Sequence, residues 1–339
     1  MKNNYQAWNI DIQEFNRQKS DRDRLRFLIK FAILAPSSHN SQPWDFKIIN
    51  NALFLLRNPA RFLPVSDPLN RHVYIALGCA IENFSIAADY FGFPTDIEYF
   101  PDEFPDATAK ISLVPLPRQS SLHDHLIFSI PERRSNRNPY DNELPRNGII
   151  DHFKKYSSHD IYVDFVSDHA KKIAIAEYLI RFREKEFENK EFRKEMAAYK
   201  KTNFTASPIG MPGFTMGFGN FLSLIAPFLI KYINVIRFIR TKEISLLVDH
   251  TPVFGFIGSQ GDSKKEWLSV GRILEHILLE AERDGLQTSI NALPFEVVEL
   301  QQIMGISHRP QIFFRLGYTK SIPFHSPRLR VEDITIPVE

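Results

Sequence analysis

Two stretches of this chain repeat one pattern of apolar residues and glycines. Residues 74–82 (YIALGCAIE) align with residues 267–275 (WLSVGRILE), and the same gap-free register places Gly92 on Gly285. Both stretches have helical apolar spacing, and each ends at a glycine suited to a left-handed C-cap. A glycine inside a helix costs about 1 kcal/mol relative to alanine, so its recurrence at position 78 and position 271 indicates that another backbone packs closely there. Chance similarity between two amphipathic helices is the alternative.

The rest of the sequence alternates between helical and strand patterns. Helices are expected at 21–35, 147–156, 168–200, 221–247 and 263–284. Strands are expected at 44–49, 52–57, 96–100, 110–114, 161–166, 252–258, 287–291 and 311–317. With the repeat, this order predicts an α+β fold of two halves, residues 1–118 and 119–339, joined near Pro115 and Pro117. Each half would pack its sheet on its long glycine-containing helix.

Composition excludes several classes of protein. The 42 basic residues are offset by 40 acidic ones and form no long basic run, which argues against a nucleic-acid partner. The single cysteine, Cys79, permits neither an internal disulfide nor a cysteine zinc site, and we expect no metal centre. The first 20 residues lack the apolar core of a signal peptide, so a reducing, cytoplasmic location is expected.

One long stretch, residues 202–230, contains no charged residue. Its glycines and prolines, with Pro227 inside the apolar part, argue against a membrane span, which needs roughly 20 good apolar helix residues. We expect a flexible cover or lid over 201–220, followed by a buried helix. Peripheral membrane association through residues 221–239 is the open alternative.

The segment 35–44, APSSHNSQPW, is the most informative for function. An apolar helix runs into Pro36, a run of small hydrogen-bonding residues follows, and Pro43 leads into a strand. A proline-braced polar loop at a helix–strand junction can hold backbone N–H groups and hydroxyls around a planar polar ligand. An ordinary turn is the other interpretation of this pattern alone.

Three further segments carry chemistry. In an extended ERRSNR segment (132–137), Arg133, Ser135 and Arg137 would share one face, and two guanidinium groups beside a hydroxyl suit a phosphate dianion. A solvated charged surface is the alternative. The segment LPFE (293–296) follows the second repeated helix and a short strand, and PRLR (327–330) places Arg328 and Arg330 on one face of an extended tail.

Together these four segments resemble the nitroreductase family of flavin oxidoreductases. The resemblance implies FMN as cofactor and NAD(P)H as electron donor, with a small-molecule electron acceptor such as a nitroaromatic or a quinone. It also implies that the flavin itself carries the chemistry, so that no catalytic side chain is assigned. The implied cofactor-binding residues are Arg133, Ser135, Arg137, Arg328 and Arg330 for the phosphate, and Pro36, Ser37, Ser38, Asn40, Pro294, Phe295 and Glu296 for the ring. We interpret His39 as a structural or ring-edge residue.

The sequence departs from the usual family order. The first half has the polar loop but no RRSxR segment, and the second half has RRSxR, LPFE and PRLR but no second polar loop. The resemblance therefore implies a fused, twin-domain type, in which the halves pair as a built-in dimer around one flavin site, with further oligomerisation left open. An alternative is a flavin-sequestering protein whose lid at 201–220 blocks access of nicotinamide.

Overall fold

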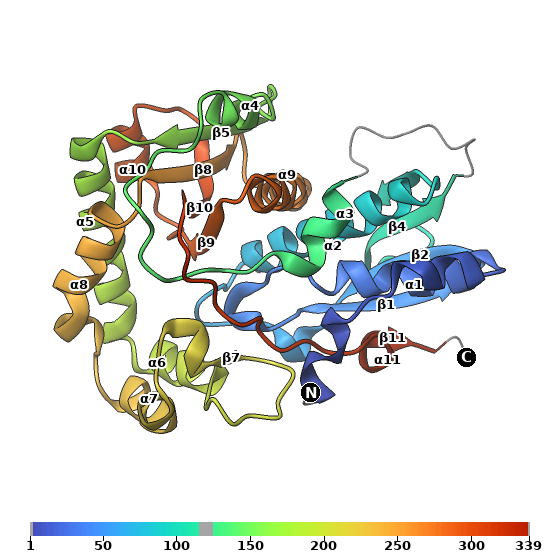
Figure 1. Ribbon diagram of the computed structural model, residues 1–339, viewed down its shortest axis with the longest axis horizontal. Helices are drawn as coiled ribbons and strands as arrows, with labels where there is room; N and C mark the ends of the chain where they lie inside the picture. Colours follow the sequence, from blue (N-terminus) through green and yellow to red (C-terminus); the bar gives the residue numbers. More distant parts are fainter. Residues whose placement is uncertain (1–2, 115–124, 338–339) are drawn as a thin grey trace.

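The computed structural model of the chain describes residues 3–114 and 125–337 and has an α+β architecture (Figure 1). The predicted division at 118/119, with Pro115 and Pro117, lies outside these described residues. The first sheet has the strand order β11-β1-β2-β4-β3 and the second has β5-β8-β10-β9. Their strands are β1 (Trp44–Ile49), β2 (Ala52–Arg57), β3 (Thr95–Tyr99), β4 (Ala107–Leu113), β5 (Ile161–Val166), β8 (Val253–Ser259), β9 (Gln287–Ala292), β10 (Arg309–Gly317) and β11 (Thr335–Ile336).

The two sheets share one topology. In each, the four main strands are antiparallel and lie in the order first, second, fourth, third along the chain. A 20-residue helix separates the second strand from the third: α2 (Arg71–Tyr90) in the first sheet and α9 (Lys264–Arg283) in the second. The sequence repeat is therefore a repeat of a whole supersecondary unit.

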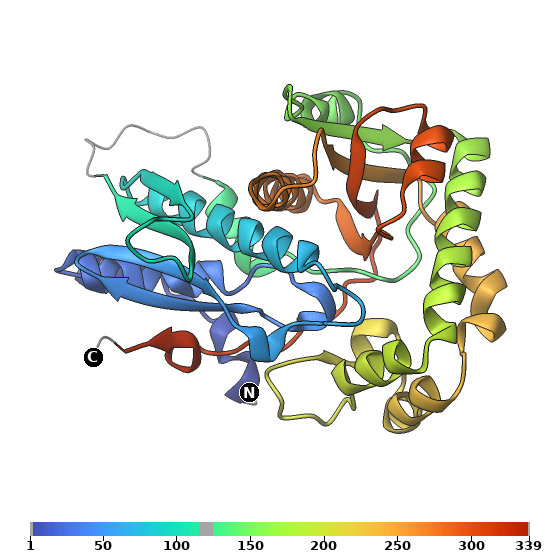
Figure 2. The ribbon, with the colours of Figure 1, turned by 180° about the vertical axis from the view of Figure 1, so that it is seen from behind.

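The helices α2 and α9 cross between the two sheets (Figures 1 and 2). A Cβ atom added at Gly78 would lie 2.2 Å from the carbonyl oxygen of Leu268, and one at Gly271 would lie 2.0 Å from that of Ile75. The predicted close backbone approach is confirmed, and the two repeated helices are each other's partners. Gly92 (φ 82°) and Gly285 (φ 77°) both adopt the left-handed conformation expected of C-caps.

One large apolar core joins both sheets, α2 and α9. It also includes α1 (Asp21–Ala32), which begins at the N-cap Ser20 as predicted. The second sheet is covered on its other side by α5 (His169–Glu188) and α8 (Ile236–Val248), and every residue of β8 is buried accordingly. The remaining helices are α3 (Leu126–Glu132), α4 (Ile149–Lys154), α6 (Lys190–Tyr199), α7 (Asn220–Tyr232), α10 (Val298–Met304) and α11 (Val331–Ile334).

Two predicted long helices are each broken in two. The helix expected at 168–200 is interrupted at Asn189, whose side chain accepts a hydrogen bond from the amide of Glu191 and caps α6. The helix expected at 221–247 is split into α7 and α8, whose axes differ by 115°. No single helix among the described residues is both long and apolar enough to cross a membrane; α7 and α8 pass that test only as this bent pair.

The chain returns to the first half at its end. Residues 325–336 run beside the N-terminal segment, where the amide of Arg328 donates to the carbonyl of Asn4, and β11 adds a parallel edge strand to β1 (Figure 1). The sequence analysis did not predict β11. The C-terminal segment thereby reaches the polar loop at 36–42.

Candidate functional site

The polar loop after α1 has an unusual backbone. His39, Asn40 and Gln42 have φ values of 53°, 55° and 53°, in the left-handed region that non-glycine residues rarely occupy. Such conformations cost of order 1–3 kcal/mol each and persist only where surrounding contacts hold them. Backbone strain of this kind is concentrated at functional sites, which agrees with the ligand-binding interpretation of the loop.

Contacts from distant parts of the chain hold this loop. The amide group of Asn40 donates to the carbonyls of Gly210 (3.0 Å) and Pro327 (2.8 Å), and its oxygen accepts from Arg328 (2.7 Å). Gln42 donates to the carbonyl of Pro208 and accepts from the amide of Leu329. The Asn40 side chain is therefore a brace for the loop.

The arginine segment is pinned to the second sheet. Ser135 forms an isolated parallel bridge to Thr288 in β9, and the amide of Asn136 donates to the carbonyl of Thr288 (2.7 Å). Asn136 is buried and points away into the protein, where its side chain donates to the carbonyl of Ser321. The side chains of this extended segment alternate between two faces as expected, except that Arg134 also lines the cleft described next.

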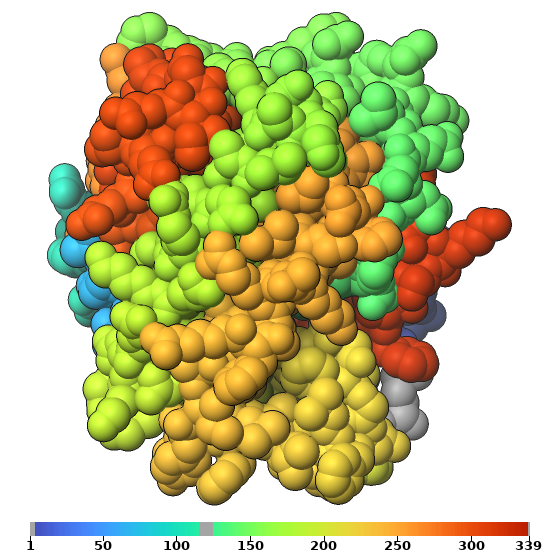
Figure 3. All heavy atoms as spheres, turned by 90° about the vertical axis from the view of Figure 1, so that its left-hand side faces the viewer, coloured from blue at the N-terminus to red at the C-terminus, as the bar shows by residue number. Residues whose placement is uncertain are grey.

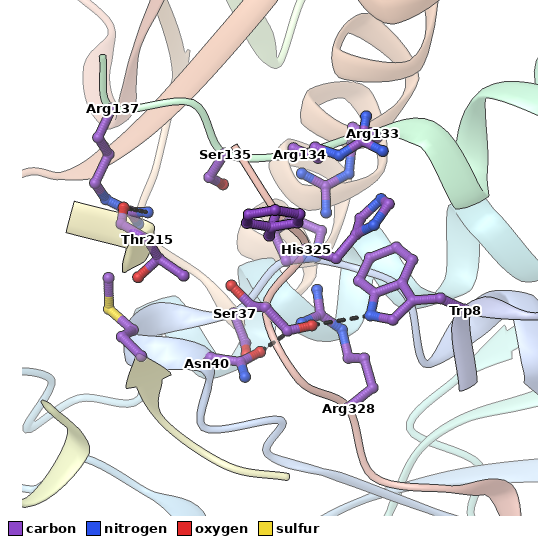
Figure 4. Close-up of a pocket in the computed structure, with 14 residues that line it drawn as sticks. Trp8, Ser37, Asn40, Arg133, Arg134, Ser135, Arg137, Thr215, His325 and Arg328 are labelled. Atoms are coloured by element: carbon purple, nitrogen blue, oxygen red, sulfur yellow. Dashed lines mark hydrogen bonds between the residues drawn. The ribbon is translucent and has the colours of Figure 1, made fainter. Parts of the chain in front are cut away.

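The polar loop and the arginine segment line one cleft (Figure 4). Ser37 and Ser135, nearly 100 residues apart in the sequence, contribute to the same lining. The complete lining is Trp8, Pro36, Ser37, Asn40, Arg133, Arg134, Ser135, Arg137, Met211, Thr215, Phe324, His325, Ser326 and Arg328. Seven of the twelve predicted site residues, Pro36, Ser37, Asn40, Arg133, Ser135, Arg137 and Arg328, are thus brought together.

Positive charge dominates one end of the cleft. Arg133 is 2% exposed and Arg328 is 4% exposed, and burial together with the neighbouring Arg133 lowers the pKa of Arg328 to about 9. Burial and three arginines, Arg134 first among them, lower the pKa of His325 to about 3. His325 is therefore neutral at physiological pH, and the arginines carry the charge.

Among the described residues, Arg133 forms its ion pair with Glu275. Glu275 of α9 lies with Oε1 3.3 Å from Nε of Arg133, yet the atoms are not aligned for a hydrogen bond. Nε and Nη1 of Arg133 are both buried without a hydrogen-bond acceptor among the described residues. Burial raises the pKa of Glu275 to about 6 in spite of Arg133. This end of the cleft has buried donors to spare for an anion.

A second basic group adjoins Arg137. Burial lowers the pKa of Lys200 to about 7, with further contributions from Arg137 and Arg183. Burial, Lys200 and Arg137 likewise lower the pKa of His39 to about 3. Two half-buried, mutually repelling cations beside the cleft favour the binding of a negatively charged ligand.

Arg330 is the clearest correction to the sequence analysis. Its guanidinium pairs with Asp333 (2.9 Å) at the start of α11, on the surface and outside the cleft lining. The tail turns into the α11 helix immediately after Arg330, so the two arginines of PRLR do not share a face. Arg328 is buried, and it donates to the carbonyls of Ile33, Leu34 and Ala35 at the end of the first helix.

The segment 294–296 lies outside the cleft lining, as does Ser38. Arg71, at the start of α2, donates to the carbonyl of Pro294 (3.3 Å) and stacks over the ring of Phe295, while Glu296 accepts from Tyr178 through its backbone carbonyl. His72 contacts Arg71, and burial, Arg71 and the nearby His39 lower its pKa. Arg71 thus contacts both this segment and His72, which lies near His39 of the polar loop.

Several lining residues were not predicted. Trp8 stacks on His325 with ring centroids 4.0 Å apart, and Arg328 lies over the Trp8 ring. Met211 and Thr215 come from the segment 207–216, which also binds the polar loop. Trp8 and His325 belong to no recognisable sequence motif and lie near opposite ends of the chain, so only the fold shows that they are in contact.

No family model matches the chain. It is 31% identical to the "Putative NAD(P)H nitroreductase Rv3131" of Mycobacterium tuberculosis over 127 residues, which span 37% of this chain and only 36% of that relative. It is 22% identical to the "Uncharacterized protein Rv3127" of the same organism over 329 residues, covering 91% of this chain and 92% of the relative.

Among solved structures, a "putative nitroreductase" from Anabaena variabilis is similar with a TM-score of 0.53 at 11% identity, covering 92% of each chain. This likeness shows the fold, and it extends over nearly the whole molecule. The name of the Rv3131 relative and the fold of the Anabaena protein together support the nitroreductase resemblance found in the sequence.

Proposed function

We propose that this chain is an FMN-binding oxidoreductase that accepts electrons from NAD(P)H and passes them to a small acceptor such as a nitroaromatic or a quinone. One observation carries the proposal: Ser37 of the polar loop and Ser135 of the arginine segment line the same cleft. The nitroreductase name of the Mycobacterium tuberculosis relative and the shared fold support the same conclusion.

The donor set suits the phosphate of FMN. Arg133 has two buried nitrogens without a hydrogen-bond acceptor among the described residues, and Ser135 and Arg137 line the cleft beside it. Buried guanidinium groups bind phosphate through strong charge-assisted hydrogen bonds. Arg328 would contribute positive charge rather than hydrogen bonds to the phosphate, because its own donors are already directed at backbone carbonyls. Arg330 is left out of the proposed site.

The flavin ring would extend from this phosphate end toward the polar loop. Pro36 and Ser37 line the cleft, Asn40 braces the loop, and Ser38 opens the short helical turn that carries His39. Residues 294–296 would stand on the far side of the ring, near His72. When bound, FMN would supply the transfer of a hydride and of electrons, while the protein orients the reactants and excludes water.

The same proposal includes a pseudo-dimer within one chain. The halves 1–118 and 119–339 would correspond to two subunits, because each contains the same four-strand order with one central helix. The crossing of α2 and α9 would be the subunit seam, with one flavin site beside it. The polar loop then comes from one half and the phosphate arginines from the other.

The test is the visible spectrum of the purified protein, followed by titration with FMN. We expect a yellow protein with a single FMN per chain, which NAD(P)H bleaches under anaerobic conditions. Arg137→Gln should weaken FMN binding about 10- to 100-fold, because a lost hydrogen bond to a charged group costs about 1.5–3 kcal/mol. Arg330→Gln is the matched control and should bind FMN as the parent chain does. A colourless protein that takes up no FMN would end the proposal.

A second candidate function rests on the segment 207–216. This part of the predicted lid, residues 201–220, is hydrogen-bonded to Asn40 and Gln42 of the polar loop, and Arg137 donates to the carbonyl of Thr215. A lid held in this way could retain FMN and exclude nicotinamide, which would make the chain a flavin-sequestering protein. Bound FMN that dithionite reduces but NAD(P)H does not would support this function, and rapid bleaching by NAD(P)H would exclude it.

The lid itself can be tested without substituting a residue of the cleft lining. Asn203 organises the segment: its oxygen accepts from the amide of Phe214 (2.7 Å) and its amide group donates to the carbonyl of Phe218 (3.1 Å). Asn203→Ala should loosen the segment and speed both the release of FMN and its reduction by NAD(P)H. Equal rates in the variant and the parent chain would show that the segment does not limit access.

A further inference from the structure

The helix α7 presents an apolar surface to solvent. Five large side chains recur at helical spacing on its outer side and are between 36% and 76% exposed. They are Phe221, Leu224, Ile225, Phe228 and Tyr232, and we call them the α7 face. The opposite side of the helix, with Ser223, Ala226 and Ile230, is buried against the protein. An amphipathic surface helix normally presents polar and charged side chains to solvent and packs its apolar side chains against the protein.

This surface is concentrated in one part of the molecule. Of the 20 exposed large hydrophobic side chains in the described chain, nine lie between residues 221 and 239. The four beyond the α7 face include Ile233 and Phe238, the latter 81% exposed, in the turn to α8 and in α8 itself. In Figure 3 the orange atoms of this region run from the middle of the face to the lower end of the molecule. Contiguous exposed apolar surface of this kind marks an interaction site.

The charged residues within the segment that carries the α7 face have one sign. Residues 202–242 contain four basic residues and no acidic residue. Arg237 and Arg240 pair with glutamates of α5, at 3.0 Å from Glu188 and 2.7 Å from Glu184, respectively. Lys231 and Lys242 are exposed, and Lys231 lies over the ring of Tyr232. A partner of matching chemistry must offer an apolar layer bordered by negative charge.

We propose that the α7 face docks on the surface of an anionic lipid bilayer. The five apolar side chains run along the length of the helix, so α7 would lie in the plane of the interface with Phe221 and Phe228 inserted and Lys231 among the headgroups. A second copy of the chain is a poorer partner, because two like faces would bring lysines of the same sign together. A span is also a poorer fit, since 13 residues of helix cover about 20 Å and the hydrocarbon core is about 30 Å thick.

The experiment is flotation of the full chain with vesicles of phosphatidylcholine and phosphatidylglycerol in roughly equal amounts, and with vesicles of phosphatidylcholine alone. We expect binding to the anionic vesicles that weakens as salt is added. Phe221→Ser together with Phe228→Ser should reduce the bound fraction at least about tenfold, because each exposed ring contributes burial on insertion. Lys231→Gln should reduce partitioning about fivefold, since it removes one charge near the anionic surface.

The matched control removes exposed apolar side chains elsewhere. Leu144→Ser with Ile173→Ser changes residues that are 58% and 42% exposed and distant in sequence from α7, and this variant should float as the parent chain does. Failure of the parent chain to float with anionic vesicles would overturn the proposal, as would equal binding to both vesicle types. Dimers in sedimentation that Phe228→Ser abolishes, without vesicle binding, would instead assign the α7 face to a second copy.

Discussion

The contact between Gly78 and Gly271 gives the sharpest prediction for stability. Alanine at position 271 would place its Cβ 2.0 Å from the carbonyl oxygen of Ile75, whereas ordinary contact begins at 3.4 Å, so the two helices must separate by about 1.4 Å. Both helices are buried here, and overpacking of such a core costs about 1–3 kcal/mol or more. A backbone contact of 2.0 Å puts this cost at the upper end of that range. Because alanine regains about 1 kcal/mol of helix propensity, we expect Gly271→Ala to lower the free energy of unfolding by about 2 kcal/mol.

Urea unfolding followed by circular dichroism measures this effect. Gly219→Ala is the control: its Cβ would meet nothing within 4 Å and its φ is −64°, so its free energy of unfolding should change by less than about 1 kcal/mol. The double variant Gly78→Ala/Gly271→Ala should cost less than the sum of the single variants, because both separate the same helix pair. A Gly271→Ala protein as stable as the parent chain, or more stable, would refute the described crossing of α2 and α9.

Three further predictions concern the site and its surroundings. The first concerns Lys200, whose pKa of about 7 lies below its ordinary value: a bound phosphate would favour the charged lysine and raise that pKa, so FMN affinity should fall as pH rises above about 7. Calorimetric titration should show proton uptake on binding in the parent chain and a flatter pH dependence in Lys200→Met; identical profiles would place Lys200 away from the phosphate. The second is that Asn40→Ala should destabilise the chain by about 3 kcal/mol, because it removes three hydrogen bonds of a buried side chain and a residue tolerant of left-handed backbone, and it should expose 208–216 to proteases. Unchanged protease resistance would contradict that role. The third is that burial raises the pKa of the Cys79 thiol, so thiol reagents should label the native chain far more slowly than the urea-unfolded chain; equal rates would show that α2 opens readily.

The sequence was sufficient for features that depend on local pattern. Strands β1, β2 and β5 begin and end where predicted, and the turn at Asn50 and Asn51 has the positive φ values expected of a two-residue hairpin loop. The glycines of the repeat predicted a close backbone approach, which the helix crossing confirms. Such features are encoded within a few residues, or by a repeat that can be aligned.

Features with a weak local signal, or set by long-range contacts, were missed. The break at Asn189 has no glycine or proline to signal it, and the bend after α7 follows Ile233 without a polar cluster. The spacing of Arg328 and Arg330 could not show that the two side chains point in different directions, because it is the start of α11 that turns Arg330 outward. Burial of the helix at α7 was predicted from its apolar composition, but composition does not tell which side of such a helix meets the protein, and its outer side is exposed.

The C-terminal segment has a consequence for how the cleft assembles. Its walls come from Trp8, the polar loop, the arginine segment, the segment 207–216 and residues 324–328, all from one covalent chain. Folding therefore builds the cleft in a unimolecular step, and the ligand-binding capacity of each molecule should not change on dilution. Removing the last 15 residues would take away Arg328 and the β11 edge strand together, so a truncation at this end changes the wall of the cleft itself.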